Sequence, residues 1–292
     1  MEVIKTPDVV FPNLGISIDS LNRVAINIFG FSIYWYGIML MLGVLAGYLI
    51  AVRGAKKAGE DPAMYTNFLF IVVIACIIGA RIYYVIFSWE DFRGDLLAIF
   101  NTRKGGMAIY GTVIAAVITA VVYTRVKKID FFKFTDIAIF GLIAGQVIGR
   151  LGNFINKEAF GEFTNSFLAI QYKLADVDKS NVTQMMMDNL VLRGNVSYIQ
   201  VHPTFLYEML WNIGLFILMS VYKRYKAFEG ELFALYFVGY GIGRYWIEGM
   251  RTDQLKLGGT NIPVSQLLSF LLALGGIAFI IYKRRMVKKA NG

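Results

Sequence analysis

The order of apolar and polar residues divides the chain into long hydrophobic segments separated by shorter polar ones. About seven of these segments are long enough to cross a hydrocarbon layer of about 30 Å. They lie at approximately residues 34–52, 65–88, 106–123, 131–148, 204–222, 231–247 and 263–282. The pattern predicts an all-α polytopic membrane protein with about seven transmembrane helices.

Composition agrees with this interpretation. The 292 residues are 57% hydrophobic and 17% charged, which is too apolar for a water-soluble domain of this length. The formal net charge of +9 would suit a nucleic-acid partner, but basic residues in membrane proteins have a simpler use in fixing orientation. A single cysteine, Cys76, excludes an internal disulfide and gives no zinc set. We therefore predict no nucleic-acid partner, no metal and no cofactor.

Basic residues gather in alternate loops. Lysine and arginine are dense around residues 53–57, 125–133, 223–226 and 283–289, whereas the longer loops between them are poorer in both. Because basic residues near span ends favour the cytoplasm, the N-terminus is predicted outside and the C-terminus inside.

The predicted organisation has five parts. Residues 1–33 form an extracytoplasmic arm with no signal peptide, because acidic residues and Pro12 interrupt any apolar core. The alternation between Ile26 and Ile33 is compatible with a short strand or an interfacial helix. Four spans follow in 34–156, then a small extracytoplasmic head in 157–203, three spans in 204–282 and a basic cytoplasmic tail in 283–292.

Three glycine-arginine steps carry the first candidate chemistry. Arg81, Arg150 and Arg244 each follow a glycine or a glycine-alanine pair near the outward end of a predicted span. Ionisable groups inside a membrane are costly and usually mark a site, and guanidinium groups match phosphate oxygens bidentately. If these helix ends converge, they form a phosphate-binding site. The competing interpretations are an interfacial anchor for Arg150 and snorkelling to the interface for Arg81.

A polar face on the sixth predicted span strengthens the site hypothesis. Tyr240, Arg244, Glu248 and Arg251 recur at helical spacing and so share one face. Arg244 and Glu248 at i, i+4 can simply neutralise each other, which is the common structural use. The longer polar face is more than a single pair requires.

The stretch 149–161, GRLGNFINKEAFG, places Arg150, Asn153 and Glu158 together with Gly161 where an apolar helix ends. This run closely resembles the signature of the prolipoprotein diacylglyceryl transferases, an integral membrane family. Four further runs resemble the same family: WYG at 35–37, GGMAIYG at 105–111, HPTFLYE at 202–208 and YGIGRYWIEGMR at 240–251. Two positions depart from its pattern: many relatives have glycine where this chain has Lys157, and histidine where it has Tyr110.

The resemblance implies transfer of the diacylglyceryl group of phosphatidylglycerol to the lipobox cysteine thiol of a prolipoprotein, forming a thioether and releasing glycerol phosphate. It also implies a multi-pass protein of the bacterial cytoplasmic membrane, with phosphatidylglycerol and prolipoprotein signal peptides as partners. The competing class is a polytopic lipid transporter or flippase, which the absence of an apparent internal repeat disfavours.

The candidate site residues fall into two groups. The predicted catalytic residues are Arg150, Arg244, Tyr110, Glu158 and Glu248. The predicted substrate-binding residues are Arg150, Asn153, Tyr36, Arg81, Arg244, Arg251, Gly161, His202 and Tyr240.

The base that removes the thiol proton stays open. Tyr110, with an ordinary pKa near 10, is a better hydrogen-bond donor than base at neutral pH. The base candidates are Glu158, Glu248 and His202, with Glu158 first, and the released phosphate oxygen is an alternative. Glu208 in the fifth span is either a structural hydrogen-bond acceptor or part of a polar site.

Overall fold

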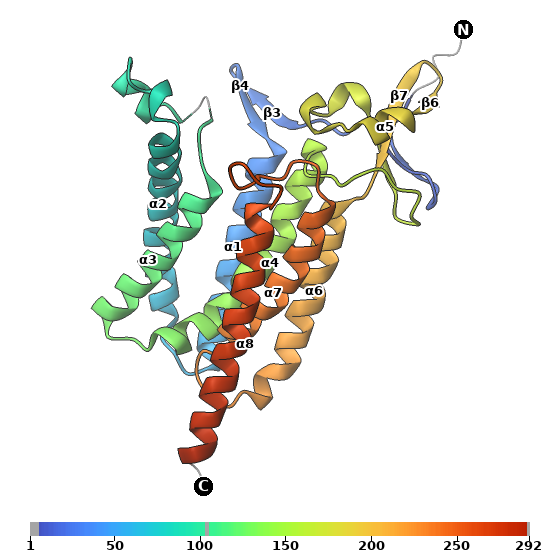
Figure 1. Ribbon diagram of the computed structural model, residues 1–292. Coiled ribbons are helices and arrows are strands. Elements are labelled where there is room, and N and C mark those ends of the chain that lie inside the picture. The colour runs from blue at the N-terminus through green and yellow to red at the C-terminus, as the bar shows by residue number, and fades with distance from the viewer. Residues whose placement is uncertain (1–5, 103–104, 291–292) are drawn as a thin grey trace. The chain divides into compact units, whose positions relative to one another are not determined.

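The computed structural model describes residues 6–102 and 105–290 (Figure 1). Residues 1–5 of the predicted arm and 291–292 of the predicted tail lie outside this part. Contacts divide the chain into two compact units, Met1–Gly47 with Ile139–Gly292 and Tyr48–Ala138. The long helices α1 and α4 run from one unit into the other.

In residues 6–102 and 105–290, seven long helices follow the predicted spans. They are α1 (Trp35–Lys57), α2 (Pro62–Phe87), α3 (Ile109–Lys127), α4 (Phe131–Asn156), α6 (Thr204–Tyr222), α7 (Glu231–Met250) and α8 (Val264–Ala290). Within the described residues, all of these except α7 are long and apolar enough to cross a membrane. Helix α7 is less apolar because it contains Glu231, Arg244 and Glu248. The prediction of a mainly helical multi-pass membrane protein is confirmed, whereas its orientation stays a prediction.

The ends of the helices differ slightly from the prediction. Helix α4 continues through the signature stretch to Asn156, so Arg150 and Asn153 lie in its last two turns. Helix α8 includes the C-terminal basic residues and continues to Ala290, so most of the predicted tail at 283–292 is helical. Many large apolar side chains on the long helices are exposed, as expected for surfaces that face lipid rather than water.

The extramembrane head is a small antiparallel sheet. Its strand order is β2-β1-β5-β7-β6, formed by β1 (Val9–Phe11), β2 (Ile16–Ile18), β5 (Ile170–Lys173), β6 (Val191–Arg193) and β7 (Val196–Val201). Strands β1 and β2 come from the N-terminal arm, so the arm and the head form one folded part rather than two. A short helix, α5 (Gln184–Asp188), packs Met186 into the apolar core of the head beside Ile199.

The alternating stretch before the first span is a β-hairpin. Strands β3 (Val24–Ile28) and β4 (Phe31–Tyr34) pair antiparallel, which decides between the two open alternatives in favour of a strand. The apolar side chains of the hairpin are exposed, and Phe29 at its tip is 99% exposed. Such a surface, joined directly to α1, suits the interface of a membrane better than water.

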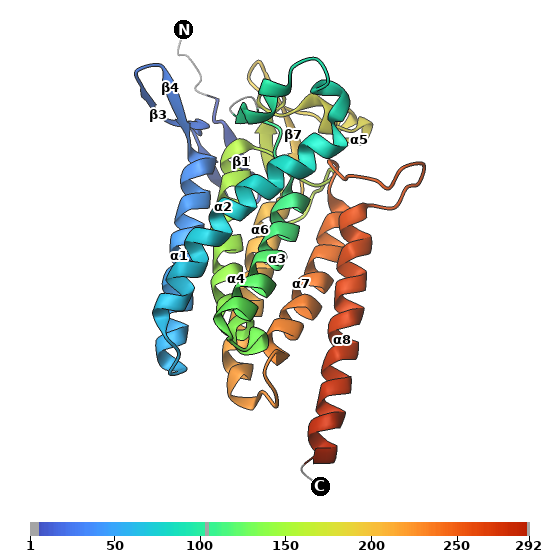
Figure 2. The ribbon, with the colours of Figure 1, turned by 90° about the vertical axis from the view of Figure 1, so that its left-hand side faces the viewer.

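Close backbone contacts hold α1 and α4 together in the first unit. Gly43 and Gly47 of α1 lie against Gly145 and Gly141 of α4, where an added Cβ would come within 2.3–3.2 Å of a facing carbonyl oxygen. This is the small-residue packing that lets membrane helices approach closely. Helices α7 and α8 lie side by side in the same unit (Figure 2). In the second unit, α2 and α3 meet in the same way at Gly79 and Gly111.

A cluster of charged residues joins the arm to the rest of the head. Lys173 on β5 lies 2.7 Å from Asp8, and Lys157 at the end of α4 pairs with both Asp8 and Asp176. Burial raises the pKa of Asp8, but the Leu21 N–H and the lysines outweigh it, so the pKa lies below its ordinary value of 3.8. The hydrogen bond to Asp8 raises the pKa of Lys173 above 10.5.

We expect Gly141→Ala to lower the thermal stability of the protein in detergent. The new methyl group would lie 2.3 Å from the Gly47 carbonyl oxygen, so the backbones must separate, at a cost of about 1–3 kcal/mol. Gly275→Ala on α8 is the matched control, because a Cβ there meets nothing within 4 Å and should leave the unfolding midpoint unchanged or raised. Equal midpoints for the two variants would contradict close packing of α1 on α4.

The second prediction concerns acid stability of the head. The lowered pKa of Asp8 means that its carboxylate stabilises the fold fully above about pH 3.8 and progressively less as the pH falls through the folded pKa. Asp8→Asn should therefore lower the thermal midpoint at pH 7 by about 2–6 °C. The wild type should lose more stability than this variant between pH 5 and pH 2. Parallel pH profiles of the two proteins would show that Asp8 does not carry this dependence.

Candidate functional site

The signature stretch places Arg150 at the head end of α4 with both ends of its guanidinium engaged. Its Nη1 donates to Asn153 Oδ1 at 3.1 Å, and its Nη2 donates to Glu208 of α6. Asn153 in turn donates to Glu158 Oε1 at 2.8 Å. The arginine therefore begins a chain of polar contacts that leads out of the helix bundle to the turn after α4.

Glu208 lies at the centre of the cluster. Its side chain is only 3% exposed, and each carboxylate oxygen faces one guanidinium: Oε1 accepts from Arg150, and Oε2 accepts from Arg244 Nη1 at 3.0 Å. Three helices, α4, α6 and α7, thus meet at one buried carboxylate. The predicted convergence of Arg150 and Arg244 is present in the structure.

Glu208 is not among the site residues that the sequence predicts. The signal that identifies it is electrostatic, because two arginines placed in a membrane need a nearby counter-charge. Glu208 is the buried acid that α6 brings to the same level as Arg150 and Arg244.

The polar face of α7 continues the cluster. Arg244 Nη2 lies 2.5 Å from Glu248 Oε2, and Arg251 Nε lies 3.9 Å from the same oxygen. This oxygen is buried and accepts no well-formed hydrogen bond in the described structure. Arg251 is held instead by Asp253 through two bonds of 2.8 and 2.7 Å. Burial opposes the charge of Arg251, but Asp253 raises its pKa above the ordinary value.

Two predicted aromatic residues border the cluster. Tyr240, one turn before Arg244, lies close enough to Arg150, Arg244 and Glu208 for all three to act on its hydroxyl electrostatically. The Tyr36 ring covers Gly152, where an added Cβ would lie 2.6 Å from Cδ2. Glycine at 152 is therefore needed for this close approach, which brings Tyr36 near the charges of Arg150 and Glu158.

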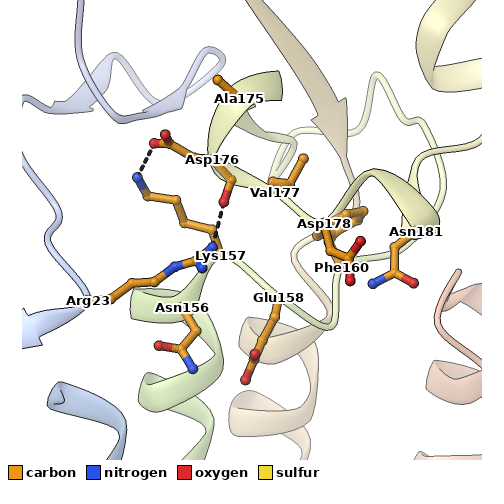
Figure 3. A pocket seen from close by; sticks show the side chains of 10 residues that line it. All are labelled: Arg23, Asn156, Lys157, Glu158, Phe160, Ala175, Asp176, Val177, Asp178 and Asn181. Atoms are coloured by element: carbon orange, nitrogen blue, oxygen red, sulfur yellow. Dashed lines mark hydrogen bonds and ion pairs between the residues drawn. The ribbon is translucent and has the colours of Figure 1, made fainter.

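The turn after α4 directs Glu158 toward the cluster. Lys157 and Ala159 both have positive φ angles, 54° and 57°, a conformation that favours glycine. Burial and the ion pair of Lys157 with Asp176 hold the turn in place. A pocket of about 330 Å³ opens here, and Figure 3 shows Glu158 pointing away from that ion pair.

Gly161 and His202 fix the joint between the head and the bundle. The Gly161 N–H donates to the His202 carbonyl at 3.0 Å, and a Cβ at 161 would lie 2.8 Å from the His202 Cβ. The His202 Nδ1 lies 3.1 Å from the Tyr207 hydroxyl. Burial lowers the pKa of His202, which keeps its ring neutral at pH 7.

The remaining two predicted site residues belong to the second unit. Arg81 is buried, and its guanidinium donates to the carbonyls of Ala98, Ile99, Asn101, Gly105 and Gly106. These bonds use its N–H groups to organise the loop before α3. Tyr110 lies in the first turn of α3, with its ring 6.2 Å from that of Tyr83.

Sequence comparison gives the family. A model of the prolipoprotein diacylglyceryl transferase family matches residues 23–282. The chain belongs to this family. It is similar to proteins named phosphatidylglycerol–prolipoprotein diacylglyceryl transferase from Clostridioides difficile (38% identity; 90% of this chain, 95% of the relative) and Listeria innocua (41%; 93% and 93%). A relative with the same name from Bacillus cereus is 39% identical over 92% of this chain and 95% of its own. The resemblance read from the signature stretch is thus confirmed.

Glu208→Gln is expected to abolish most transferase activity. The substitution keeps the shape of the side chain but leaves two guanidinium groups without their shared counter-charge, and breaking a buried pair typically costs about 3–5 kcal/mol. We expect turnover to fall by a factor of at least about 10². Glu229→Gln, which breaks an exposed pair with Lys226, is the control and should retain activity. Near-normal turnover of Glu208→Gln would show that the cluster works without this charge.

Proposed function

We propose that this protein transfers the diacylglyceryl group of phosphatidylglycerol to the lipobox cysteine thiol of a prolipoprotein. The names of its relatives describe them as diacylglyceryl transferases of phosphatidylglycerol and prolipoprotein. The observation that supports it most in this chain is the pair of guanidinium groups, Arg150 and Arg244, fixed around Glu208 inside a membrane bundle.

The proposed reaction is a substitution at carbon. The cysteine sulfur forms a bond to the terminal glycerol carbon of the diacylglyceryl group, and the bond from that carbon to the phosphate oxygen breaks. Glycerol phosphate leaves with the bonding electrons, and the thiol proton passes to a base or to the departing phosphate. Ionising a thiol of pKa about 8.5 at pH 7 costs only about 2 kcal/mol, so stabilisation of the leaving group is the larger task.

Arg150 and Arg244 are proposed to bind the phosphate and stabilise the charge that develops on it. Each of the two guanidinium groups has more N–H donors than its contacts with Asn153, Glu208 or Glu248 use. Glu208 fixes the planes of both guanidinium groups before the substrate arrives, so little reorganisation is needed during the reaction. Arg251 and Glu248 extend this face, while Tyr240, Tyr36 and Asn153 are proposed to position the lipid headgroup.

Glu158 is the proposed base. Glu208 and Glu248 both form ion pairs with arginine, so guanidinium groups already occupy their carboxylates. Glu158 has no ion pair among the described residues, accepts only from the neutral Asn153 amide, and borders the pocket below the head. His202 remains the alternative, and Tyr110 is proposed to orient a substrate by hydrogen bonding.

The substrates imply the setting. A lipid and a membrane-anchored signal peptide both reach the site from the plane of the bilayer. We propose the bacterial cytoplasmic membrane, with the head on its outer face, because the basic stretches 223–226 and 283–289 lie at the ends of α6 and α8 that point away from the head (Figure 1).

An assay with purified components tests this function. The protein in phosphatidylglycerol vesicles is mixed with a lipobox peptide, and the mass of the peptide is followed. We expect the mass to increase by one diacylglyceryl group, and a peptide with serine in place of the cysteine to stay unchanged. Arg150→Lys keeps the charge but loses the bidentate fork, so it should be strongly impaired, and Arg150→Ala should lose a factor of about 10²–10³.

The same preparation separates the two functional classes. A lipid transporter would move labelled phosphatidylglycerol across the vesicle membrane without modifying the peptide. That result, or an Arg150→Ala protein with normal turnover, would overturn the proposal.

A further inference from the structure

A second layer of polar residues lies one helical turn deeper in the bundle than the charged cluster. Gln146 precedes Arg150 by four residues, Asn212 follows Glu208 by four, and Tyr240 precedes Arg244 by four. Residues four apart share a face of a helix and differ in height by about one turn. Because α6 runs opposite to α4 and α7 along the bundle, all three shifts lead away from the head (Figure 1). We call Gln146, Asn212 and Tyr240 the inner polar layer.

Helix contacts place Gln146 and Asn212 at comparable depth. Helices α4 and α6 touch at Arg150 and Glu208, and again further from the head, where the rings of Phe140 and Phe216 are 5.6 Å apart. Asn212 lies midway between the two α6 contacts, and Gln146 lies nearly midway between the two on α4. The next buried residues in the direction away from the head include the apolar side chains of Ile143 and Leu215.

The polar atoms of this layer are incompletely satisfied. Asn212 is 0% exposed, and neither its Nδ2 nor its Oδ1 has a hydrogen-bond partner in the described structure. Gln146 Nε2 lies 2.8 Å from the Tyr236 hydroxyl, whereas its buried Oε1 has no partner there. Leaving a buried polar group unpaired typically costs about 1–3 kcal/mol, so such groups call for a reason.

The Gln146 amide has a second possible arrangement. The Tyr236 hydroxyl can either accept or donate a hydrogen bond, so turning the amide over would keep that contact. After this change the unpaired group of Gln146 would be an amide N–H rather than the carbonyl oxygen. In this arrangement both Asn212 and Gln146 offer an unpaired amide N–H within the bundle.

We propose that two members of the inner polar layer, Asn212 and Gln146, bind the ester carbonyls of the lipid, with Asn212 as the principal donor. This inference rests on the proposed function, which puts the lipid phosphate at Arg150 and Arg244. The phosphorus and the nearer ester carbonyl are separated by an ester oxygen and part of the glycerol backbone, a span comparable to one helical turn of about 5.4 Å. The acyl chains must continue toward the hydrocarbon, and the apolar residues beyond the layer lie in that direction.

The chemistry of the two partners agrees with this assignment. Ester carbonyls accept hydrogen bonds and donate none, and the amide groups supply the donors. A lipid whose ester groups are replaced by ethers would leave these buried donors unpaired, so the site should discriminate against it. The ester bonds are not broken in the proposed reaction, so a diether lipid is chemically competent and serves as a probe.

The experiment compares diester and diether phosphatidylglycerol of equal chain length as donors to the lipobox peptide. We expect the wild type to prefer the diester by about tenfold in kcat/KM. Asn212→Leu should reduce kcat/KM for the diester by about five- to tenfold and leave the diether value within about twofold. Its thermal midpoint should be unchanged or higher, because an apolar side chain replaces an unpaired amide.

Met219→Leu is the matched control, since it changes a buried residue on the same face of α6 and should preserve both the rates and the lipid preference. Three results would overturn the inference. The wild type could show no preference between the diester and the diether lipid, or Asn212→Leu could lose kcat/KM equally on both. The loss caused by Asn212→Leu could also depend on the hydroxyl groups of the lipid headgroup rather than on the ester groups. The wild-type comparison holds even where the variant fails to fold. A wild type that transfers neither lipid group would refute the proposed function rather than this inference.

Discussion

The bundle depends on one buried carboxylate shared by two guanidinium groups. Glu208 of α6 is nearly inaccessible and would be strongly unfavourable alone in a membrane interior, as would Arg150 of α4 and Arg244 of α7. Each charge is tolerated because the other two are fixed beside it. The same contacts set the height and rotation of three helices relative to one another. The need of each buried charge for a partner therefore also determines the geometry of the proposed phosphate site.

A second buried carboxylate secures the opposite end of α7. Glu231 is 0% exposed and accepts from Tyr222 of α6 at 2.8 Å and from Arg284 of α8 at 2.5 Å. With Arg244 and Glu248 near the other end, α7 is held at both ends by polar contacts with neighbouring helices. Its lower hydropathy is therefore consistent with a place inside the bundle, where side-chain partners replace lipid.

The apolar runs predicted the long helices because length and hydropathy are local properties of a membrane span. The charged pairs Arg150–Glu208 and Lys157–Asp176 were not predictable in the same way, since their partners lie far apart in the chain. Arg81 illustrates the limit of a local motif: its glycine-rich context matches that of Arg150, yet its donors are used by carbonyls of the segment between α2 and α3. The pairing of β1 with β5 likewise depends on a contact between distant segments.

The counter-charges around the arginines also bear on turnover in the proposed reaction. Two unpaired guanidinium groups in a low-dielectric site would hold any phosphate tightly, and tight binding of substrate and product alike does not speed the chemical step. Glu208 and Glu248 offset part of that attraction while keeping both guanidinium planes fixed. The phosphate gains negative charge as the carbon–oxygen bond breaks. The remaining N–H donors therefore bind the departing glycerol phosphate more strongly than the intact phosphodiester of the lipid. The same carboxylates that make the cluster tolerable in the membrane thus limit how tightly the phosphate is held and help release glycerol phosphate.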